Sequence, residues 1–189
     1  ALLKKLRSDT AESELSCQKE PLTSADLQAL ADILAENLLL VKIDLRECGV
    51  DVAGAQALGA ALKLNKTLKE LDLRWNADIG DEGCKALAEG LAENRSLERI
   101  DLGGCRIATA GAQALGTALK ANGTLKDLYL GYNDALGAEG CEALAEGILR
   151  NVGLVEVNLK WCDVPEVCEK ALAAAAEGNP TLQLLQVRS

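Results

Sequence analysis

The sequence contains no histidine, no phenylalanine and no methionine, and its only aromatic residues are two Trp and two Tyr in 189 positions. Without histidine there is no imidazole general base, no Ser-His or Cys-His nucleophile pair and no imidazole metal ligand. The sequence also lacks a phosphate-binding loop, a paired catalytic carboxylate motif and a zinc-type cysteine cluster. We therefore expect a protein that is not an enzyme and has no catalytic residues, no metal and no cofactor.

Long apolar runs are missing as well, although 49% of the residues are hydrophobic. No stretch reaches the roughly 20 apolar residues that cross a bilayer, so we expect no direct membrane insertion. Residues 1–6 lack the apolar run of a secretory signal, and a start at Ala1 without Met is expected of a processed or excerpted chain. With so few aromatic rings, the core must be packed with Leu, Ala, Val and Ile.

Positive charge is in deficit, because 20 basic residues face 29 acidic ones and the formal net charge is −9. Nonspecific binding to phosphates needs a positive face, so nucleic acid is not an expected partner. An acidic surface speeds encounters with basic proteins, which makes a basic protein partner one interpretation. The alternative is that these charges only keep the exterior solvated.

A leucine-rich pattern recurs along most of the chain. Its copies alternate between 28 residues, as in 40–67, and 29 residues, as in 68–96. Residues 40–96 and 97–153 are identical at 32 of 57 aligned positions. Such self-similarity predicts a repeat architecture in which each copy is one structural unit.

Each copy divides into two elements. The segment Leu-x-x-Leu-x-Leu alternates with period two, which predicts a short strand whose leucines face one way. Residues 83–94 then place Leu87 and Leu91 four positions apart, the spacing of one helical face. Since neither element can bury its apolar face alone, successive copies stack, with a parallel sheet inside the curve and helices outside.

The pattern resembles the ribonuclease-inhibitor-like leucine-rich-repeat family, which also includes receptor sensor domains, tropomodulin-type actin cappers and Ran GTPase activators. The resemblance covers residues 40–182, and alternation of 28-residue and 29-residue units is especially typical of ribonuclease inhibitors. In one recurring slot, cysteine and asparagine alternate from repeat to repeat: Cys48, Asn76, Cys105, Asn133 and Cys162. The resemblance implies an α/β solenoid with a concave sheet, convex helices and a protein-binding role.

We expect a single leucine-rich-repeat domain over residues 1–189, with about five full repeats. Residues 1–39 form an N-terminal cap and an atypical first repeat, in which 1–12 is a short capping helix and Thr23 a helix cap. Residues 40–181 are the regular repeats. Residues 182–189 form a terminal strand whose open edge needs a cover, from a missing segment or a neighbouring subunit.

Most of the seven cysteines are expected to be buried free thiols. Equivalent cysteines recur every two repeats, which places them roughly 10 Å apart and beyond disulfide reach. An odd number of reduced thiols favours an intracellular location, in the cytoplasm or in an organelle if a targeting peptide was removed. Asn76 and Asn133 receive a structural role, since a buried amide can bond backbone groups left open where strand becomes turn.

The candidate binding surface is the concave face, where the residues between the inward leucines project from the sheet. All four aromatic residues of the protein fall there, and Trp, Tyr and Arg are enriched in the hot spots of interfaces. The alternative is that the rings only cover the strand-to-turn junctions of neighbouring repeats. The predicted partner-binding residues are Trp75, Tyr129, Tyr132, Trp161, Asp44, Arg46, Glu47, Asp72, Arg74, Asp101, Asn158 and Lys160. Gly103, Gly104 and Gly131 are expected to leave a shallow gap between the Trp75 side and the Trp161 side.

The sequence thus favours a protein-protein interaction module or scaffold, alone or as part of a larger assembly or sensor. One alternative is a GTPase activator, in which Arg46 or Arg74 would stabilise the charge of phosphoryl transfer. Another is an actin-filament capping protein, which rests on fold analogy alone.

Overall fold

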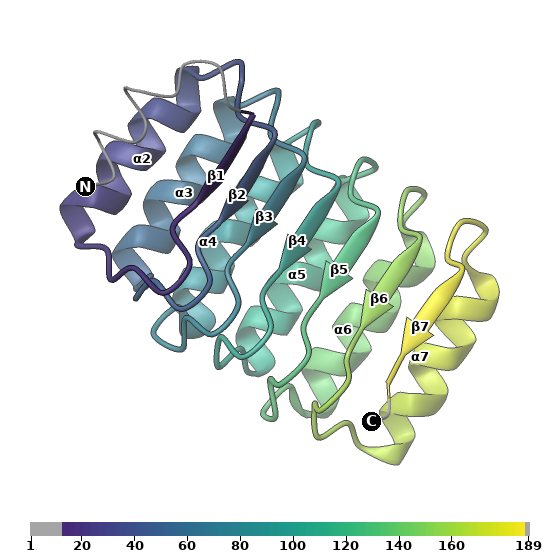
Figure 1. Ribbon diagram of the computed structural model, residues 1–189. Coiled ribbons are helices and arrows are strands. Elements are labelled where there is room, and N and C mark those ends of the chain that lie inside the picture. The colour runs from purple at the N-terminus through teal and green to yellow at the C-terminus, as the bar shows by residue number, and fades with distance from the viewer. Residues whose placement is uncertain (1–12, 188–189) are drawn as a thin grey trace.

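The computed structural model describes residues 13–187, in which seven strands alternate with six helices (Figure 1). The strands are β1 (Glu14–Ser16), β2 (Lys42–Asp44), β3 (Glu70–Asp72), β4 (Arg99–Asp101), β5 (Asp127–Tyr129), β6 (Glu156–Asn158) and β7 (Leu184–Gln186). The helices are α2 (Ser24–Glu36), α3 (Val52–Leu64), α4 (Gly80–Glu93), α5 (Thr109–Ala121), α6 (Gly137–Arg150) and α7 (Glu166–Gly178). The helix expected at 1–12 and residues 188–189 of the terminal strand lie outside the described residues.

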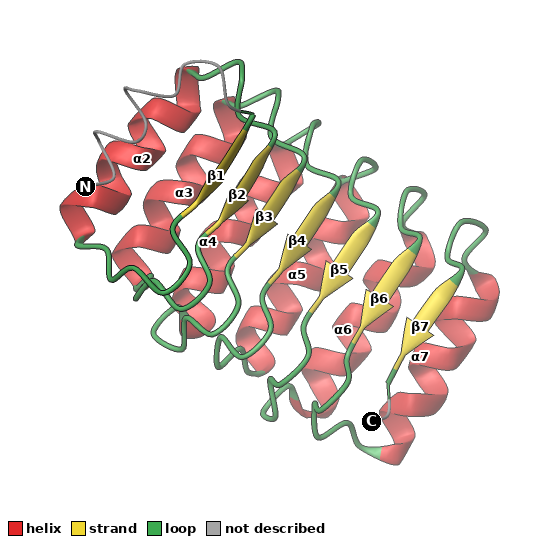
Figure 2. Cartoon of the chain, viewed as in Figure 1, coloured by secondary structure: helices red, strands yellow, loops and turns green. Residues whose placement is uncertain are grey.

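All strands belong to one parallel sheet in sequence order, with the helices in a second layer behind it (Figure 2). The central residue of each strand pairs with its equivalent in the next repeat, as Ile43 does with Leu71. These central side chains point into the core between sheet and helices, where Ile43 and Ile100 are fully buried. The leucine-rich-repeat solenoid predicted from the sequence is confirmed. Strands pack about 4.8 Å apart and helices 8 to 10 Å apart, which makes the sheet the concave side.

Glycines allow the helix backbones to touch. A Cβ atom added at Gly59 of α3 would fall inside van der Waals contact with the carbonyl oxygen of Ala86 in α4. Gly116 of α5 stands in the same relation to Ala143 of α6. At these positions a side chain would force neighbouring repeats apart.

The helix starts combine local and neighbouring caps. Thr23 caps α2 as expected. The Asp26 carboxylate accepts a hydrogen bond from the Thr23 backbone N–H, which completes a capping box. The N-terminus of α5 has no cap of its own. Asp81 of the preceding helix supplies one, because its carboxylate accepts hydrogen bonds from the backbone N–H groups of Ala108 at 2.8 Å and Gly111 at 2.9 Å. Capping thus contributes to the contact between repeats.

The structural role of Asn76 and Asn133 is confirmed. The Asn76 side-chain oxygen accepts from the N–H groups of Cys48 at 3.1 Å and Val50 at 3.0 Å, and its amide donates to the Leu45 carbonyl at 2.9 Å. The cysteines that alternate with these asparagines donate through sulfur instead, as Cys105 does to Leu73 O at 3.2 Å. The slot therefore joins each turn to the preceding repeat.

A second asparagine ladder runs where each helix leads back to the sheet. Its members are Asn65, Asn94, Asn122, Asn151 and Asn179, and all five are buried. Each amide donates to a carbonyl near the end of the preceding helix and to the carbonyl of the preceding asparagine, as Asn122 does to Leu91 and Asn94. Each side-chain oxygen accepts two backbone N–H groups of its own turn, here those of Thr124 and Leu125. These asparagines recur once per repeat in the sequence, but their bonds to the preceding repeat are seen only in the structure.

All seven cysteines are buried and free, as expected. Burial raises the pKa of the Cys105 thiol to about 12 and that of Cys48 to about 11, so both stay protonated at neutral pH. They act as small core residues and not as reactive thiolates. No helix within residues 13–187 has the length and apolar character needed to cross a membrane.

Candidate functional site

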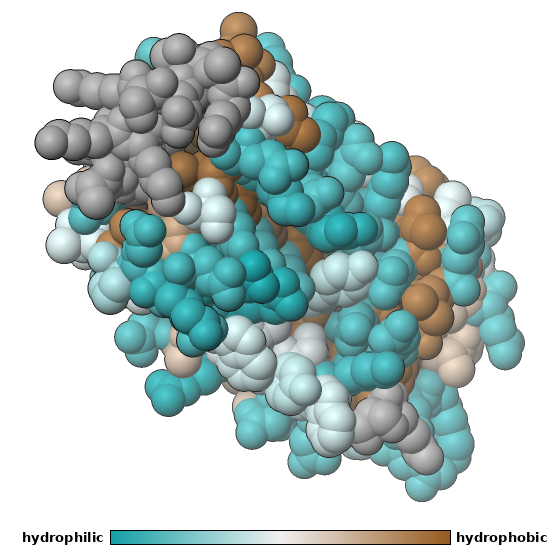
Figure 3. Space-filling model, in the orientation of Figure 1, coloured by the Kyte–Doolittle hydropathy of each residue, from teal (hydrophilic) through white to brown (hydrophobic). Residues whose placement is uncertain are grey.

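The concave face is the exposed surface of the sheet, and hydrophilic side chains cover most of it (Figure 3). Because strand residues alternate, both neighbours of each buried central residue project from this face. The residues predicted to bind a partner all follow the central one. The same rule adds an earlier column that this prediction omitted: Lys42, Glu70, Arg99, Asp127 and Glu156.

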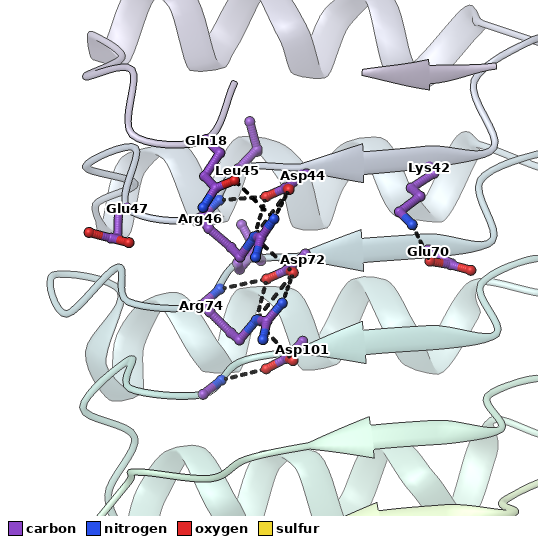
Figure 4. A network of polar contacts seen from close by, with 12 residues as sticks. Gln18, Lys42, Asp44, Leu45, Arg46, Glu47, Glu70, Asp72, Arg74 and Asp101 are labelled. Carbon is purple, nitrogen blue, oxygen red and sulfur yellow. Dashed lines mark hydrogen bonds and ion pairs between the residues drawn. The ribbon is translucent and has the colours of Figure 1, made fainter. Parts of the chain in front are cut away.

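Five of the predicted residues form one ladder of ion pairs across β2, β3 and β4 (Figure 4): Asp44, Arg46, Asp72, Arg74 and Asp101. The Arg46 guanidinium is bidentate to Asp44, with Nη2 to Oδ2 at 2.6 Å, and its Nε lies 3.4 Å from Asp72. Arg74 repeats the arrangement one strand on, 2.6 Å from Asp72 and 3.2 Å from Asp101. The ladder satisfies both arginines internally.

The carboxylates at the two ends of this ladder differ in acidity. The hydrogen bond from Arg46 holds the pKa of Asp44 below its ordinary value. Burial raises the pKa of Asp101 to about 6, although the Gly103 N–H and the Arg74 guanidinium favour its ionised form. Of these two end carboxylates, Asp101 therefore titrates nearer to neutral pH.

This difference predicts a pH dependence. The folded-state pKa of Asp101 lies above its ordinary 3.8, so folding favours the protonated form. The stability that this group contributes is complete below about pH 4 and is lost as the pH rises through 6. We expect the Asp101 carboxyl carbon to titrate in NMR spectra with a midpoint near 6. In urea unfolding between pH 4 and 7, wild type should lose stability relative to D101N as the pH rises, and a constant difference would contradict the assignment.

Three aromatic rings form a continuous row along the rim where the strands end. The Trp75 and Tyr132 ring centroids are 5.0 Å apart at an interplanar angle of 47°, and those of Tyr132 and Trp161 are 5.8 Å apart at 12°. Each side chain is about half exposed, at 49% for Trp75, 51% for Tyr132 and 56% for Trp161. We call these three residues the aromatic row.

The row is held by backbone in an unusual conformation. Trp75, Tyr132 and Trp161 have φ angles of 61°, 61° and 60°, in the left-handed region that favours glycine. Inter-repeat hydrogen bonds fix these turns, as from Trp75 N–H to Gly103 O at 2.8 Å. The equivalent position is left-handed in the other repeats too, with φ angles of 62° at Lys19, 55° at Glu47 and 68° at Gly104, so this turn belongs to the repeat and not to the aromatic row alone. Gly104 in this position is the sequence signal of the left-handed turn.

The prediction of a gap at Gly104 is wrong. A Cβ atom on Gly104 would clash with the Trp75 indole, which lies across this turn and reaches Tyr132. Gly104 therefore makes room for a ring instead of leaving an opening. The aromatic side chains thus do cover one repeat junction, while half of their surface remains exposed.

An open trough of about 470 Å³ lies beside the aromatic row, above Gly103 and Gly131. Eight of the twelve predicted residues line it: Arg74, Trp75, Asp101, Tyr129, Tyr132, Asn158, Lys160 and Trp161. Glu156 and Gln186 complete the wall, and neither was predicted. The other four predicted residues, Asp44, Arg46, Glu47 and Asp72, lie outside it; Glu47 is exposed, 3.7 Å from Lys19.

Tyr129 and Asn158 hold polar positions on the wall opposite the aromatic row. The Tyr129 hydroxyl donates to Glu156 at 3.1 Å, and the Arg99 guanidinium lies 5.8 Å from its ring centroid. Burial and the nearby carboxylates raise the pKa of Tyr129 to about 12, so it remains a donor. Asn158 accepts the Lys160 N–H at 2.9 Å and donates to Gln186 at 3.2 Å. The trough thus joins an aromatic wall to a polar one.

Comparison with known proteins agrees with the leucine-rich-repeat fold. A leucine-rich-repeat family pattern matches residues 64–88, 93–116 and 121–145. The chain is 30% identical to the pig (Sus scrofa) ribonuclease inhibitor over 168 residues, which is 82% of this chain and 36% of that protein. It is 39% identical over 105 residues to human (Homo sapiens) NACHT, LRR and PYD domains-containing protein 12, which is 55% of this chain and 10% of that protein. The chain thus spans only a minor part of each relative.

A solved structure has the same fold. The leiomodin-1 actin-binding site 2 superposes with a TM-score of 0.54 over 94% of this chain and 86% of that chain, at 18% identity. This likeness concerns the path of the backbone alone.

Proposed function

The chain belongs to the ribonuclease-inhibitor-like leucine-rich-repeat family, and we propose that it is a binding module whose concave face holds a protein partner. The observation that carries the proposal is the aromatic row. The aromatic residues are excluded from the core, and three of them form one half-exposed line of rings. Large rigid side chains that contribute contact area at low entropic cost are typical anchors of protein interfaces.

The proposed partner is a basic protein. The net charge of −9 attracts such a partner at long range, most strongly at low salt. The proposal also places the protein in a reducing, intracellular compartment, which the seven buried free thiols support. It assigns no catalytic activity to the chain.

The alternative of a GTPase activator gains little from the two candidate arginines. Arg46 and Arg74 are each paired with two carboxylates, so neither guanidinium is free to meet a phosphate. A residue that stabilises phosphoryl transfer must instead meet the charge of the phosphates. The actin-capping alternative rests on the backbone likeness to leiomodin-1 alone.

The proposal predicts that Trp75→Ala/Trp161→Ala weakens partner binding strongly and leaves the fold intact. Each Ala removes a half-exposed ring that supports no buried core, and a hot-spot residue contributes roughly 2 kcal/mol or more, so affinity should fall at least about thirtyfold. Partners captured from native lysate on the wild-type domain are identified by mass spectrometry and then titrated against the purified variants.

A matched control removes exposed apolar surface elsewhere. Leu64 at the end of α3 is 63% exposed and Val152 after α6 is 69% exposed, and neither lines the trough. L64A/V152A should retain the partner. A partner that is lost with this control but kept by the tryptophan variant would move the binding surface away from the concave face. Circular dichroism of both variants checks that the fold is unchanged.

A further inference from the structure

Two charged groups of the trough form no ion pair within residues 13–187. Its charged lining residues are Arg74, Asp101, Glu156 and Lys160. Arg74 and Asp101 pair with each other at 3.2 Å. Within residues 13–187, neither Glu156 nor Lys160 forms an ion pair, and the Glu156 carboxylate accepts only the neutral Tyr129 hydroxyl at 3.1 Å.

The unpaired state of Glu156 follows from a break in an alternating row of charges. In the first column of the sheet, Lys42 pairs with Glu70 at 3.2 Å and Arg99 pairs with Asp127 at 2.7 Å. Glu156 comes next in the column, and the equivalent position of β7 is Leu184 instead of a cation. Among the described residues of the sheet, this carboxylate is therefore left facing the trough without a counterion.

Lys160 does not serve as that counterion, because within residues 13–187 no ion pair joins it to Glu156. Lys160 lies in the turn that follows β6, whereas Glu156 is the first residue of that strand. The Glu156 side of the trough can therefore attract a cation from a partner.

The remaining walls suit a long, flat cation. Tyr129 ends β5 and Tyr132 lies in the turn that follows, on either side of Gly131 in the sequence, so a side chain that crosses this glycine can contact an aromatic ring at each end. The Arg99 guanidinium already lies over the Tyr129 ring at 5.8 Å, which shows that this face accommodates a cation against an aromatic ring. A guanidinium combines stacking on aromatic rings with a bidentate bond to a carboxylate, which a compact ammonium cannot match.

We propose that the trough receives an arginine side chain of the protein partner, with its guanidinium on the Glu156 carboxylate and its methylene groups crossing Gly131 toward the aromatic row. This inference rests on the proposed function, since it names the chemical group that the concave face selects. Gly103 and Gly131 let the methylene groups approach the backbone. Glu156 determines specificity, and the aromatic row supplies contact area.

The two tryptophans give a direct readout, because they are the only Trp residues of the chain and both line the trough. The ¹⁵N-labelled protein is titrated with the blocked tripeptide Ac-Gly-Arg-Gly-NH₂, and the two indole N–H cross-peaks are followed, with Trp75→Phe for their assignment. Parallel titrations use the same peptide with citrulline, lysine or leucine in place of arginine. Citrulline keeps the shape of arginine and removes its charge.

We expect the arginine peptide to shift both indole signals and to bind about tenfold more tightly than the citrulline peptide, the effect of one charge-assisted hydrogen bond. E156Q should lower the affinity for the arginine peptide by a similar factor and leave the citrulline peptide unaffected. E98Q is the matched control, because Glu98 lies on the same face outside the trough and is already paired with Lys69 at 2.9 Å and Lys126 at 2.6 Å. It should retain wild-type affinity.

Equal binding of the arginine, citrulline and leucine peptides, or an arginine affinity that E156Q leaves unchanged, would overturn this inference. So would the absence of any shift at millimolar peptide. The proposed function fails by a different result, namely a partner that still binds W75A/W161A. A partner lost with W75A/W161A but bound equally by E156Q and wild type would retain the concave binding face and reject arginine recognition at Glu156.

Discussion

Asn122→Ala is expected to lower the free energy of unfolding by about 3 to 5 kcal/mol, because it leaves several buried backbone groups without partners. The Asn122 amide donates to Leu91 O at 2.7 Å and to Asn94 O at 3.0 Å. Its side-chain oxygen accepts from Thr124 N–H at 2.9 Å and Leu125 N–H at 2.8 Å. Each unpaired buried group costs about 1 to 3 kcal/mol, and water relieves part of the total.

The measurement is urea unfolding followed by circular dichroism, with Asn37→Ala as the control. Asn37 occupies the equivalent position after α2, is only half-buried, and accepts from the N–H groups of Leu39 and Leu40. Within residues 13–187 its amide nitrogen donates no hydrogen bond, so N37A should cost only about 1 kcal/mol. Equal destabilisation by the two variants would contradict a role for the ladder in joining the repeats.

Asn122 and Asn37 together show how much sequence periodicity can predict. Both residues lie at the same point of their repeats, which the periodic spacing of apolar residues in strands and helices locates in the sequence. It could not distinguish them energetically. That difference depends on the carbonyls of the preceding repeat, which lie about 30 positions away in sequence and reach Asn122 only when the repeats stack.

On the concave face, too, some features could be predicted from the sequence and others could not. Alternation along each strand placed Trp75, Tyr132 and Trp161 on one exposed surface, and the structure brings them into contact. The pairing of Arg46 and Arg74 with aspartates could not be predicted, because side-chain direction within a column is decided by neighbouring charges. Glu156 could have been found by applying the alternation to both sides of each buried residue. Its lack of a counterion becomes visible only when the row of charges is followed from strand to strand.

The second large effect is expected from Gly116→Ala, which should cost about 2 to 4 kcal/mol through overpacking of the contact between α5 and α6. The added Cβ atom would meet the backbone of Ala143, and backbone cannot yield as a flexible side chain can. Gly123→Ala is the control, because its Cβ atom would meet only Val152 Cγ2 at 3.7 Å, an ordinary van der Waals distance. G123A should unfold within about 0.5 kcal/mol of wild type.

Gly116→Ala should also divide the cooperative unit. In a solenoid each repeat contacts only its neighbours, so a weakened interface uncouples the repeats on its two sides. Trp75 lies before this interface and Trp161 after it, which allows Trp75→Phe and Trp161→Phe backgrounds to report on one side each. In the G116A background the two fluorescence transitions in urea should separate, whereas with Gly116 present they should coincide. Coincident transitions of lowered midpoint in G116A would mean that the asparagine ladders alone keep the repeats coupled when the helices are forced apart.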